Sequence, residues 1–354
     1  MLNYKISIIM SYLNRKKQII LTLDSIDNSI YKNFEVIIVD DGSDENERLE
    51  DIIHKYDYEI KLIRINPSIK VWINPVIANN IGIANSTGDI IVLQNPEVCH
   101  IGDVIYYIAN NLKANEYLTF SCYALPSFKH NDLLSTLDVQ NVSLIKKFIS
   151  YINYEDYKFD YKYYVNKYTD LINIKNEKEA IDHWNKIGIK EHRHCNISNI
   201  FQPQQYIDWK GWYNHPIFNK RDLNFLSCTF KSNILKIGGF DENYANGLWY
   251  DDNDFLERIK LKNIILSVDD SNVFGIHQYH NNGSAYHTDF NENKQLYNNL
   301  LLNIQKNHDC ANWKTKNYKK LYNDKDLDIF SNIPIKNKKI CIGITTYSSS
   351  KTLD

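Results

Sequence analysis

The sequence predicts a mixed α/β fold in which a mainly parallel sheet is flanked by helices. Over the first hundred residues, short apolar runs alternate with segments of helical spacing, which is typical of strand–helix–strand units. Two of the runs end in polar and acidic residues, and ligands bind beyond the carboxyl ends of the strands in such sheets. The composition, 43% hydrophobic and 24% charged over 354 residues, is that of a globular protein with a substantial core.

The individual elements follow from the spacing of the apolar residues. Strands are expected at Lys5–Tyr12, Phe34–Ser43, Glu59–Ile65 and Asp89–Leu93. Helices are expected at Lys16–Ser29, Asp44–Tyr56 and Asn74–Asn85. In the first helix, Ile19, Leu23 and Ile26 recur at the spacing of one helix face. This alternation indicates a doubly wound sheet.

The second half of the chain departs from the alternation. Residues from about Tyr151 to Asn196 are rich in Tyr, Lys and Glu and have helical spacing up to Gly188, which indicates a small helical insertion. Residues 1–332 are interpreted as one domain that contains this insertion. Near the end, KICIGITTYSSSK echoes KISIIMSYLNRK at the start. Residues 333–354 are therefore interpreted as a linker and the truncated start of another domain in a longer, multi-domain chain.

Bulk properties exclude several classes of partner and location. The formal net charge of −2 gives no electrostatic reason to expect nucleic acid or an anionic membrane as a partner. No apolar run approaches the length of a transmembrane helix, and the N-terminus lacks the layout of a signal peptide. Six scattered cysteines without a CxxC pair favour reduced thiols. We expect a cytoplasmic protein of a bacterium or of a virus-infected cell.

The first acidic motif is Asp40-Asp41-Gly42-Ser43, at the end of an expected strand. A carboxylate there can accept a hydrogen bond from an imide N–H or a ribose hydroxyl of a nucleotide. The alternative is a helix N-cap, since Asp and Ser favour that position. The motif alone leaves the two interpretations equal.

The second motif is Asn95-Pro96-Glu97, which follows the strand at Asp89–Leu93. Glu97 can bind Mg²⁺ or Mn²⁺ through oxygen, and Asn95 can coordinate or bridge through its amide. Such cations keep several waters and also bind diphosphate oxygens, so one or two protein carboxylates are enough. The alternative is a solvated turn, which Asn-Pro favours.

The third motif lies in GGFDENYANGLWYDDNDFLERI, where Asp251 and Asp252 precede an amphipathic helix. Acids at a helix start complement the helix dipole, which is the structural interpretation. The functional interpretation is a general base that faces a pocket. Further on, GIHQYH supplies His277 and His280, two imidazoles that can bind a metal.

Taken together and in this order, these stretches resemble the inverting family-2 glycosyltransferases, which have the GT-A fold. SIIMSYLNRKKQIILTLDSI is similar to their first strand and helix, VIIVDDGS to their nucleotide strand, and STGDIIVLQNPEV to the strand with their metal motif. GGFDENYANGLWYDDNDFLERI is similar to their acceptor and base segment and to that of galactosyltransferases. The resemblance covers roughly Lys5–Asn111 and Trp209–His280, and it is specific because four motifs keep their order.

The resemblance implies a nucleotide-sugar donor, with UDP as the nucleotide. Asp41 would contact the uracil or the ribose, and Ser11 and Arg15 would lie near the same base. Asn80 and Asn95 are expected among the other donor-binding residues.

The resemblance also implies a metal, Mn²⁺ or Mg²⁺, and a catalytic base. Glu97 takes the place of the second aspartate of the metal motif, and His277 that of the late histidine that completes metal binding, with His280 as a substitute. Asp252 takes the place of the base, and Asp251 that of an acidic neighbour that positions the acceptor. The acceptor would be a glycan or glycoconjugate. Residues expected on its side of the site are Trp212, Tyr213, His215 and Trp249.

The expected activity is metal-dependent transfer of a hexosyl or N-acetylhexosaminyl group with inversion. Asn95-Pro96-Glu97 departs from the usual acid pair, but Glu97 keeps a carboxylate and His277 can supply a second ligand, so we expect the metal site to survive. The alternative is an inactive pseudo-glycosyltransferase that binds a nucleotide sugar or glycan. A nicotinamide-dependent oxidoreductase lacks its glycine fingerprint here, because Gly82 stands alone before Gly88.

Overall fold

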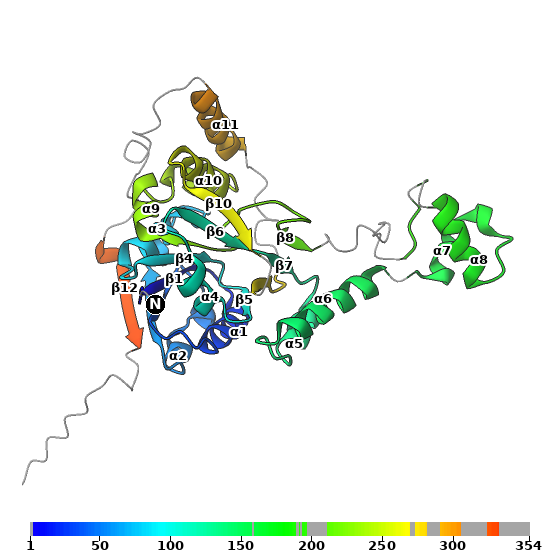
Figure 1. Ribbon diagram of the computed structural model, residues 1–354, viewed down its shortest axis with the longest axis horizontal. Coiled ribbons are helices and arrows are strands. Elements are labelled where there is room, and N and C mark those ends of the chain that lie inside the picture. Colours follow the sequence, from blue (N-terminus) through cyan, green and yellow to red (C-terminus); the bar gives the residue numbers. More distant parts are fainter. Residues whose placement is uncertain are drawn as a thin grey trace, which may run out of the picture.

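The computed structural model is a mixed α/β structure around one large twisted sheet (Figure 1). It describes residues 3–157, 159–188, 191, 193–196, 211–269, 273–281, 291–305 and 324–332. The strands of the large sheet lie in the order β10-β6-β9-β4-β1-β2-β3-β12. Their bounds are β1 (Ile6–Tyr12), β2 (Phe34–Asp40), β3 (Glu59–Ile65), β4 (Ile90–Gln94), β6 (Glu116–Phe120), β9 (Leu226–Phe230), β10 (Ile265–Asp269) and β12 (Leu327–Asn332).

Most neighbouring strands of this sheet are parallel. β1 pairs in parallel with both β2 and β4, and β3 extends the parallel part beyond β2. Only β9 and β12 run antiparallel to their neighbours in the described sheet. The predicted fold class, a mixed and mainly parallel sheet with flanking helices, is therefore confirmed.

Helices cover both faces of the sheet, which explains why the strands are apolar along their whole length. In β1, Ile8 and Met10 point into the core beneath one face, and Ile9 points into the core beneath the other. The first face is covered by α1 (Lys16–Asp27), α2 (Glu50–Ile53) and α4 (Val104–Asn111). The second is covered by α3 (Val76–Asn85), α9 (Lys231–Ile237) and α10 (Asp251–Leu261).

A smaller sheet brings distant parts of the chain together beside the first. Its order is β5-β11-β7-β8, with β5 (Val98–Ile101), β7 (Cys122–Ala124), β8 (Trp212–Asn214) and β11 (Phe274–His277). β11 runs antiparallel to β5, and the register sets His277 opposite Val98. His277 thus lies beside the turn that follows β4, although the two are far apart in the sequence.

One expected element is wrong in length. The helix predicted over Asp44–Tyr56 is a short 3-10 turn, η1 (Glu45–Glu47), followed by the four-residue α2. Arg48 between them has an extended backbone, with ψ 151°. The Tyr12 hydroxyl donates to the carbonyl oxygen of Glu47 at 2.6 Å, so tertiary contact replaces helical hydrogen bonding there.

The helices of the middle region begin against the smaller sheet, where α5 and α6 share its core, and continue away from the large sheet (Figure 1). They are α5 (Phe128–Leu134), α6 (Val142–Tyr157), α7 (Tyr161–Lys167), η3 (Thr169–Leu171), α8 (Glu177–His183) and a π-helical turn, η4 (Trp184–Gly188). α7, η3 and α8 share a small core of Tyr164, Leu171 and Ala180. The boundary expected near Tyr151 falls inside α6, so it is not a break in secondary structure.

The remaining described helix, α11 (Asn291–Gln305), packs against α10. No helix within the described residues is both long and apolar enough to cross a membrane. The expected linker and truncated domain at residues 333–354 lie outside the described residues.

A buried ion pair fixes α10 against the rest of its layer. The Arg258 guanidinium donates to the Asp254 carboxylate through Nε at 2.8 Å and also to the carbonyl oxygens of Ile237 and Gly239, at 2.8 and 2.6 Å. The Arg258 and Asp254 side chains are 6% and 1% exposed. Asp254, the third acid of the DDND motif, therefore has a structural role: it pairs with Arg258, which ties α10 to the end of α9.

We expect Arg258→Met to lower the free energy of unfolding by about 3–5 kcal/mol, because it leaves the Asp254 carboxylate buried without its cation. Urea unfolding measures the change. The matched control is Lys260→Met on the same helix, whose ion pair with Glu257 is exposed and should contribute less than about 1 kcal/mol. Equal losses in the two variants would contradict the structural role of the buried pair.

Candidate active site

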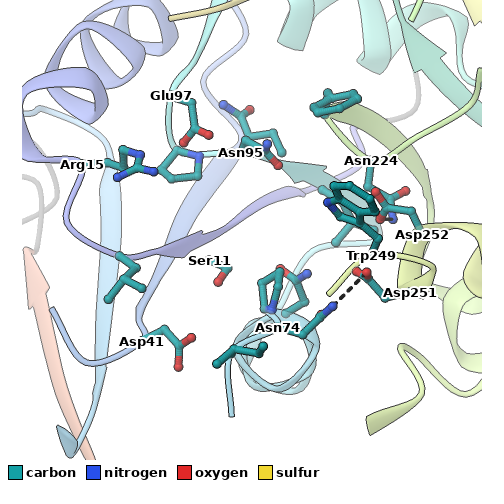
Figure 2. Close-up of a pocket in the computed structure, with 18 of the residues that line it drawn as sticks. Ser11, Arg15, Asp41, Asn74, Asn95, Glu97, Asn224, Trp249, Asp251 and Asp252 are labelled. Atoms are coloured by element: carbon teal, nitrogen blue, oxygen red, sulfur yellow. Dashed lines mark hydrogen bonds between the residues drawn. The ribbon is translucent and has the colours of Figure 1, made fainter. Parts of the chain in front are cut away.

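A pocket of about 500 Å³ lies at the carboxyl ends of the central parallel strands. β1, between β2 and β4, contributes Ser11, and the residues after each of these strands line the same hollow. The loop before α10 and the start of α3 close the opposite side. Figure 2 shows Glu97 and Arg15 on one side of the pocket, and Asp251, Asp252 and Trp249 on the other. This position, where strand order reverses in an α/β sheet, is where ligands bind in such folds.

Glu97 and two histidines form a compact group at one side of this pocket. His277 Nε2 lies 3.1 Å and His280 Nε2 lies 3.2 Å from the same oxygen, Oε1 of Glu97. The ligand atoms of the three residues all lie within 4.8 Å of one another. Burial alone would raise the pKa of Glu97, but hydrogen bonds from His277 and His280 outweigh it and hold that pKa below its ordinary value.

The chemistry of this group fits a divalent cation. One carboxylate and two imidazoles are donors that transition metals accept in proteins. His280 Nδ1 lies 3.0 Å from Arg15 Nη2, and because a guanidinium only donates, Nδ1 accepts in this contact. Arg15 thus connects the group to the nucleotide side of the pocket.

Two neighbouring carboxyls, Asp251 and Asp252, begin α10 and face the pocket. Asn74 Nδ2 donates to Asp251 Oδ1 at 2.9 Å, as the dashed line in Figure 2 shows. Asn224 Nδ2 donates to Asp252 Oδ1 at 2.7 Å. Burial, and then repulsion from Asp251, raises the pKa of Asp252 to about 8, while the hydrogen bonds from Asn224 act in the opposite direction. The pKa of Asp251 is raised by burial as well.

The loop in front of these acids has an unusual backbone. Trp249 and Tyr250 have φ values of +62° and +65°, a left-handed conformation that bulky residues rarely adopt. Asn293 Nδ2 of α11 donates to the carbonyl oxygens of Trp249 and Tyr244, at 3.0 and 3.1 Å. The loop is therefore held from behind. The Trp249 side chain remains 59% exposed at the rim of the pocket.

The two aspartates after β2 have different environments. Asp40 is buried, accepting from the backbone N–H of Ser43 at 2.8 Å and pairing with Arg64, so it shapes the turn. Asp41 lines the pocket and accepts from Trp72 Nε1 at 2.9 Å and Lys70 Nζ at 2.8 Å. Burial raises the pKa of Asp41, although Lys70 and Trp72 stabilise its charged form. Of the two, Asp41 is the one able to contact a ligand.

Some predicted site residues lie elsewhere. Asn80, expected to bind the donor, is a buried residue of α3 that does not line the pocket: its Nδ2 donates to Phe240 O at 2.9 Å, and its Oδ1 accepts from Phe240 N at 2.9 Å. This expectation is corrected, because both ends of the amide hold the chain before α10. His215 is also structural, since its Nδ1 accepts from the backbone of Ile217 and Phe218. Trp212 packs edge-to-face on the buried Tyr123.

The other predicted residues come together around the pocket. Ser11, Arg15, Asn95 and Trp249 line it along with the acids described above. Tyr213 lies beside the histidines, with its ring centroid 5.1 Å from that of His277, and it lines a smaller hollow shared with His277 and His280.

Two site residues were missed by the sequence analysis, Asn74 and Asn224. Each directs its amide at one of the paired aspartates. Asn74 stands before a proline at a helix start, which is a turn signal and nothing more specific. Asn224 precedes the apolar run of β9 with no signal at all. Their roles depend on contacts across more than 25 positions of sequence, which periodicity does not reveal.

Comparison with known proteins agrees with the resemblance drawn from the motifs. Residues 7–165, just under half of the chain, match the model of the family described as glycosyl transferase family 2. A curated relative, the amylovoran biosynthesis glycosyltransferase AmsB of Erwinia amylovora, is 36% identical over 83 residues, which are 23% of this chain and 27% of that protein. The chain thus spans about a quarter of this relative. The resemblance to family-2 glycosyltransferases is confirmed over residues 7–165.

Solved structures show a more distant likeness. A crystal structure of S. aureus TarS 1–349 in complex with UDP-GlcNAc has a TM-score of 0.46 and 13% identity, covering 84% of this chain and 67% of that one. The mannosyltransferase PcManGT from Pyrobaculum calidifontis, in complex with GDP-Man and Mn²⁺, has a TM-score of 0.39 and 10% identity, covering 88% and 72%. These TM-scores are too low to support an argument about the fold. The fold is therefore assigned from the strand order and strand directions of the sheet.

The raised pKa of Asp252 predicts a pH-dependent stability. Because folding raises this pKa from 3.8 to about 8, the protonated carboxyl favours the folded state below pH about 4, and that contribution is lost as the pH rises towards 8. The carboxamide of Asp252→Asn cannot titrate. We therefore expect the melting temperature of this variant to rise relative to that of the native chain as the pH is raised from about 5.5 to about 8. Thermal unfolding at both pH values measures this gain.

The matched control for this measurement is Asp27→Asn, at an exposed position of α1. Its difference from the native chain should be the same at the two pH values. A difference for Asp252→Asn that is equally constant would contradict the raised pKa of Asp252.

Proposed function

We propose that the chain is a metal-dependent inverting glycosyltransferase, which moves a sugar from a UDP-sugar to an acceptor hydroxyl with Asp252 as general base. One observation carries this proposal. A single pocket holds Asp41, Glu97 and Asp252 at three separate points of its wall, and His277 and His280 contact Glu97 from a smaller adjoining hollow. Those are the three functions that the reaction requires: nucleotide binding, charge neutralisation of the leaving group, and proton removal.

Asp41 is proposed to select the nucleotide. Trp72 and Lys70 each occupy one side of its carboxylate, which fixes the direction of the remaining acceptor positions. A uracil presents one imide N–H between two carbonyl oxygens, so it needs one acceptor with a donor nearby. Asp41 and Lys70 supply that pair. Ser11 and Arg15, which line the same end of the pocket, are proposed to contact the rest of the nucleotide.

The charge of the pocket supports a metal. Its lining includes the carboxyls of Asp41, Glu97, Asp251 and Asp252, against the guanidinium of Arg15. Whenever these carboxyls are ionised, they would repel a diphosphate unless a cation were bound with it. Glu97, His277 and His280 are proposed to hold Mn²⁺ or Mg²⁺, with Asn95 at the edge of the site. When bound, such an ion stabilises the negative charge that develops on the leaving diphosphate.

Asp252 is proposed to take the proton of the acceptor hydroxyl. Asn224 holds one of its carboxylate oxygens, and the other oxygen can then face the acceptor. The hydroxyl attacks the anomeric carbon on the face opposite the nucleotide, so the configuration inverts in one displacement. Asp252 stands on the side of the pocket opposite Glu97, which suits an in-line arrangement of acceptor and leaving group. Asp251, held by Asn74, is proposed to help position the acceptor.

A glycan or glycoconjugate is the proposed acceptor. The exposed ring of Trp249 at the rim and the ring of Tyr213 beside His277 can stack on sugar faces. The cytoplasmic location, the single domain with its helical insertion and the multi-domain context remain predictions.

A pseudo-glycosyltransferase is the second candidate, favoured by Asn95 in place of an acid in the metal motif. It would bind the same nucleotide sugar without transferring the sugar. Turnover distinguishes the two candidates, and binding alone does not.

Hydrolysis of nucleotide sugars tests the activity. With Mn²⁺ present and a panel of UDP- and GDP-sugars, we expect the native chain to release UDP from one donor. Asp252→Asn should lower kcat by roughly 10²–10⁴, the usual contribution of a general base, while the exposed Asp27→Asn should leave it unchanged. UDP binding without release from any donor would support the pseudo-enzyme, and no UDP binding would exclude the nucleotide-sugar site.

Metal dependence is tested by thermal stability, without turnover. We expect Mn²⁺ together with UDP to raise the melting temperature, because both ligands bind only the folded pocket. Glu97→Gln should abolish the dependence on Mn²⁺, since it removes the carboxylate shared by His277 and His280. The exposed His54→Gln is the control. A Mn²⁺-dependent shift that persists in Glu97→Gln would place the metal elsewhere.

A further inference from the structure

We infer that Tyr117 and Asn224 form a buried positioning relay that holds the carboxylate of Asp252 in its working orientation. The inference rests on the proposed function, because it concerns the proposed base. It assigns a role to two residues outside every motif that the sequence analysis identified.

The relay is a continuous chain of hydrogen bonds from the sheet to the start of α10. Tyr117, on β6, is 0% exposed, and its hydroxyl donates to Asn224 Oδ1. Asn224 Nδ2 then donates to Asp252 Oδ1 at 2.7 Å. Ser227 Oγ of β9 lies 2.7 Å from the Tyr117 hydroxyl and supports it from the far side. Three side chains thus connect the core to the proposed base.

The chemistry of the groups gives the relay one orientation when Asp252 is charged. A carboxylate only accepts hydrogen bonds, so the Asn224 amide must present its N–H groups to Asp252. Its carbonyl oxygen then faces Tyr117, whose hydroxyl can donate to it. The reversed amide would set a carbonyl oxygen against the carboxylate, which is repulsive. Burial raises the pKa of Tyr117 far above its ordinary value, so this hydroxyl stays neutral and keeps its proton for Asn224.

Rigid elements hold both ends of the relay, since Tyr117 lies on β6 and Asp252 on α10, while Asn224 lies in the turn before β9. The Tyr117 ring lies against Phe255 of α10, with centroids 5.8 Å apart, and Phe255 stacks on Phe240 at 4.5 Å. The helix that carries Asp252 is therefore packed on the same residue that begins the relay. An orientation set by packed side chains in strands and helices is the kind that catalysis requires.

The turn that carries Asn224 also connects the proposed base to the proposed metal group. The backbone N–H of Asn95 donates to the carbonyl oxygen of Phe225 at 3.2 Å, and Phe225 follows Asn224 directly. Asn224 thus lies between the turn that carries Glu97 and the carboxylate of Asp252. The relay therefore sets the orientation of the Asp252 carboxylate and also its position relative to the proposed metal group, where the leaving diphosphate would bind. Asp251 has a separate partner, Asn74, so the relay acts on one of the two acids.

Tyr117→Phe tests the relay, because it removes one hydroxyl and keeps the ring that packs on Phe255. The matched control is Tyr107→Phe, which removes the hydroxyl that donates to Asp269, at the end of edge strand β10. The assay is hydrolysis of the UDP-sugar that the native chain turns over, measured as kcat, KM and the pH dependence of kcat.

We expect Tyr117→Phe to lower kcat roughly tenfold or more, a part of the ~10²–10⁴ that a general base contributes, with KM for the donor unchanged. The rise of kcat with pH should move to higher pH, because a loosened Asn224 stabilises the charged form of Asp252 less. Tyr107→Phe should match the native chain in all three quantities. A purely structural role would not move the pH profile.

A Tyr117→Phe enzyme that equals Tyr107→Phe in kcat and in pH profile overturns the relay and leaves the proposed function intact. If Tyr117→Phe does not fold, Asn224→Asp replaces it: a second carboxylate of the same shape beside Asp252 should move the pH profile further upward, and an unmoved profile overturns the relay. A native chain and a Tyr107→Phe control that are both silent with every donor overturn the proposed function itself.

Discussion

The pairing of β11 with β5 is the interaction on which the site depends. Its register sets His277 opposite Val98, the residue after Glu97, although 180 positions of sequence separate Glu97 from His277. Gln278 locks the junction, because its backbone N–H and its Nε2 both donate to the Glu97 carbonyl oxygen, at 3.0 and 3.2 Å. Without this small sheet, Glu97 would be a lone carboxylate on a turn, without the two imidazoles that complete the proposed metal group.

The parallel strands of the large sheet position the remaining residues of the pocket. β1, β2 and β4 end side by side, so Ser11, Asp41 and the turn after Gln94 reach one edge. Across the pocket, α10 begins with two acids, and three different parts of the molecule hold its start. Arg258 fixes the helix, Asn293 fixes the loop before it, and Asn224 fixes the carboxylate. The arrangement keeps charged groups in an acidic pocket apart, each with its own partner, which favours the binding of a cation and an anionic ligand together.

The sequence was informative where one segment decides the outcome. Strands that are buried on both faces are apolar along their whole length, so runs such as Ile6–Tyr12 predicted the sheet and the order of elements along the chain. Glu97 and Asp252 could be predicted as site residues because each follows or begins a recognisable element, and both line the pocket. The predictions were wrong where tertiary contacts decide: Asn80 and His215 are polar residues near the site that hold backbone instead. Asn224 gave no signal, since its role exists only when β6, β9 and α10 meet.

The proposed function requires a divalent cation and a nucleotide diphosphate to bind together in this pocket. A crystal structure of the chain with UDP and Mn²⁺, with data collected at the manganese absorption edge, would locate both. We expect one anomalous peak between Glu97, His277 and His280, in contact with the diphosphate, with the uracil at Asp41. An anomalous peak elsewhere, or UDP bound in the pocket with no metal at this group, would contradict it.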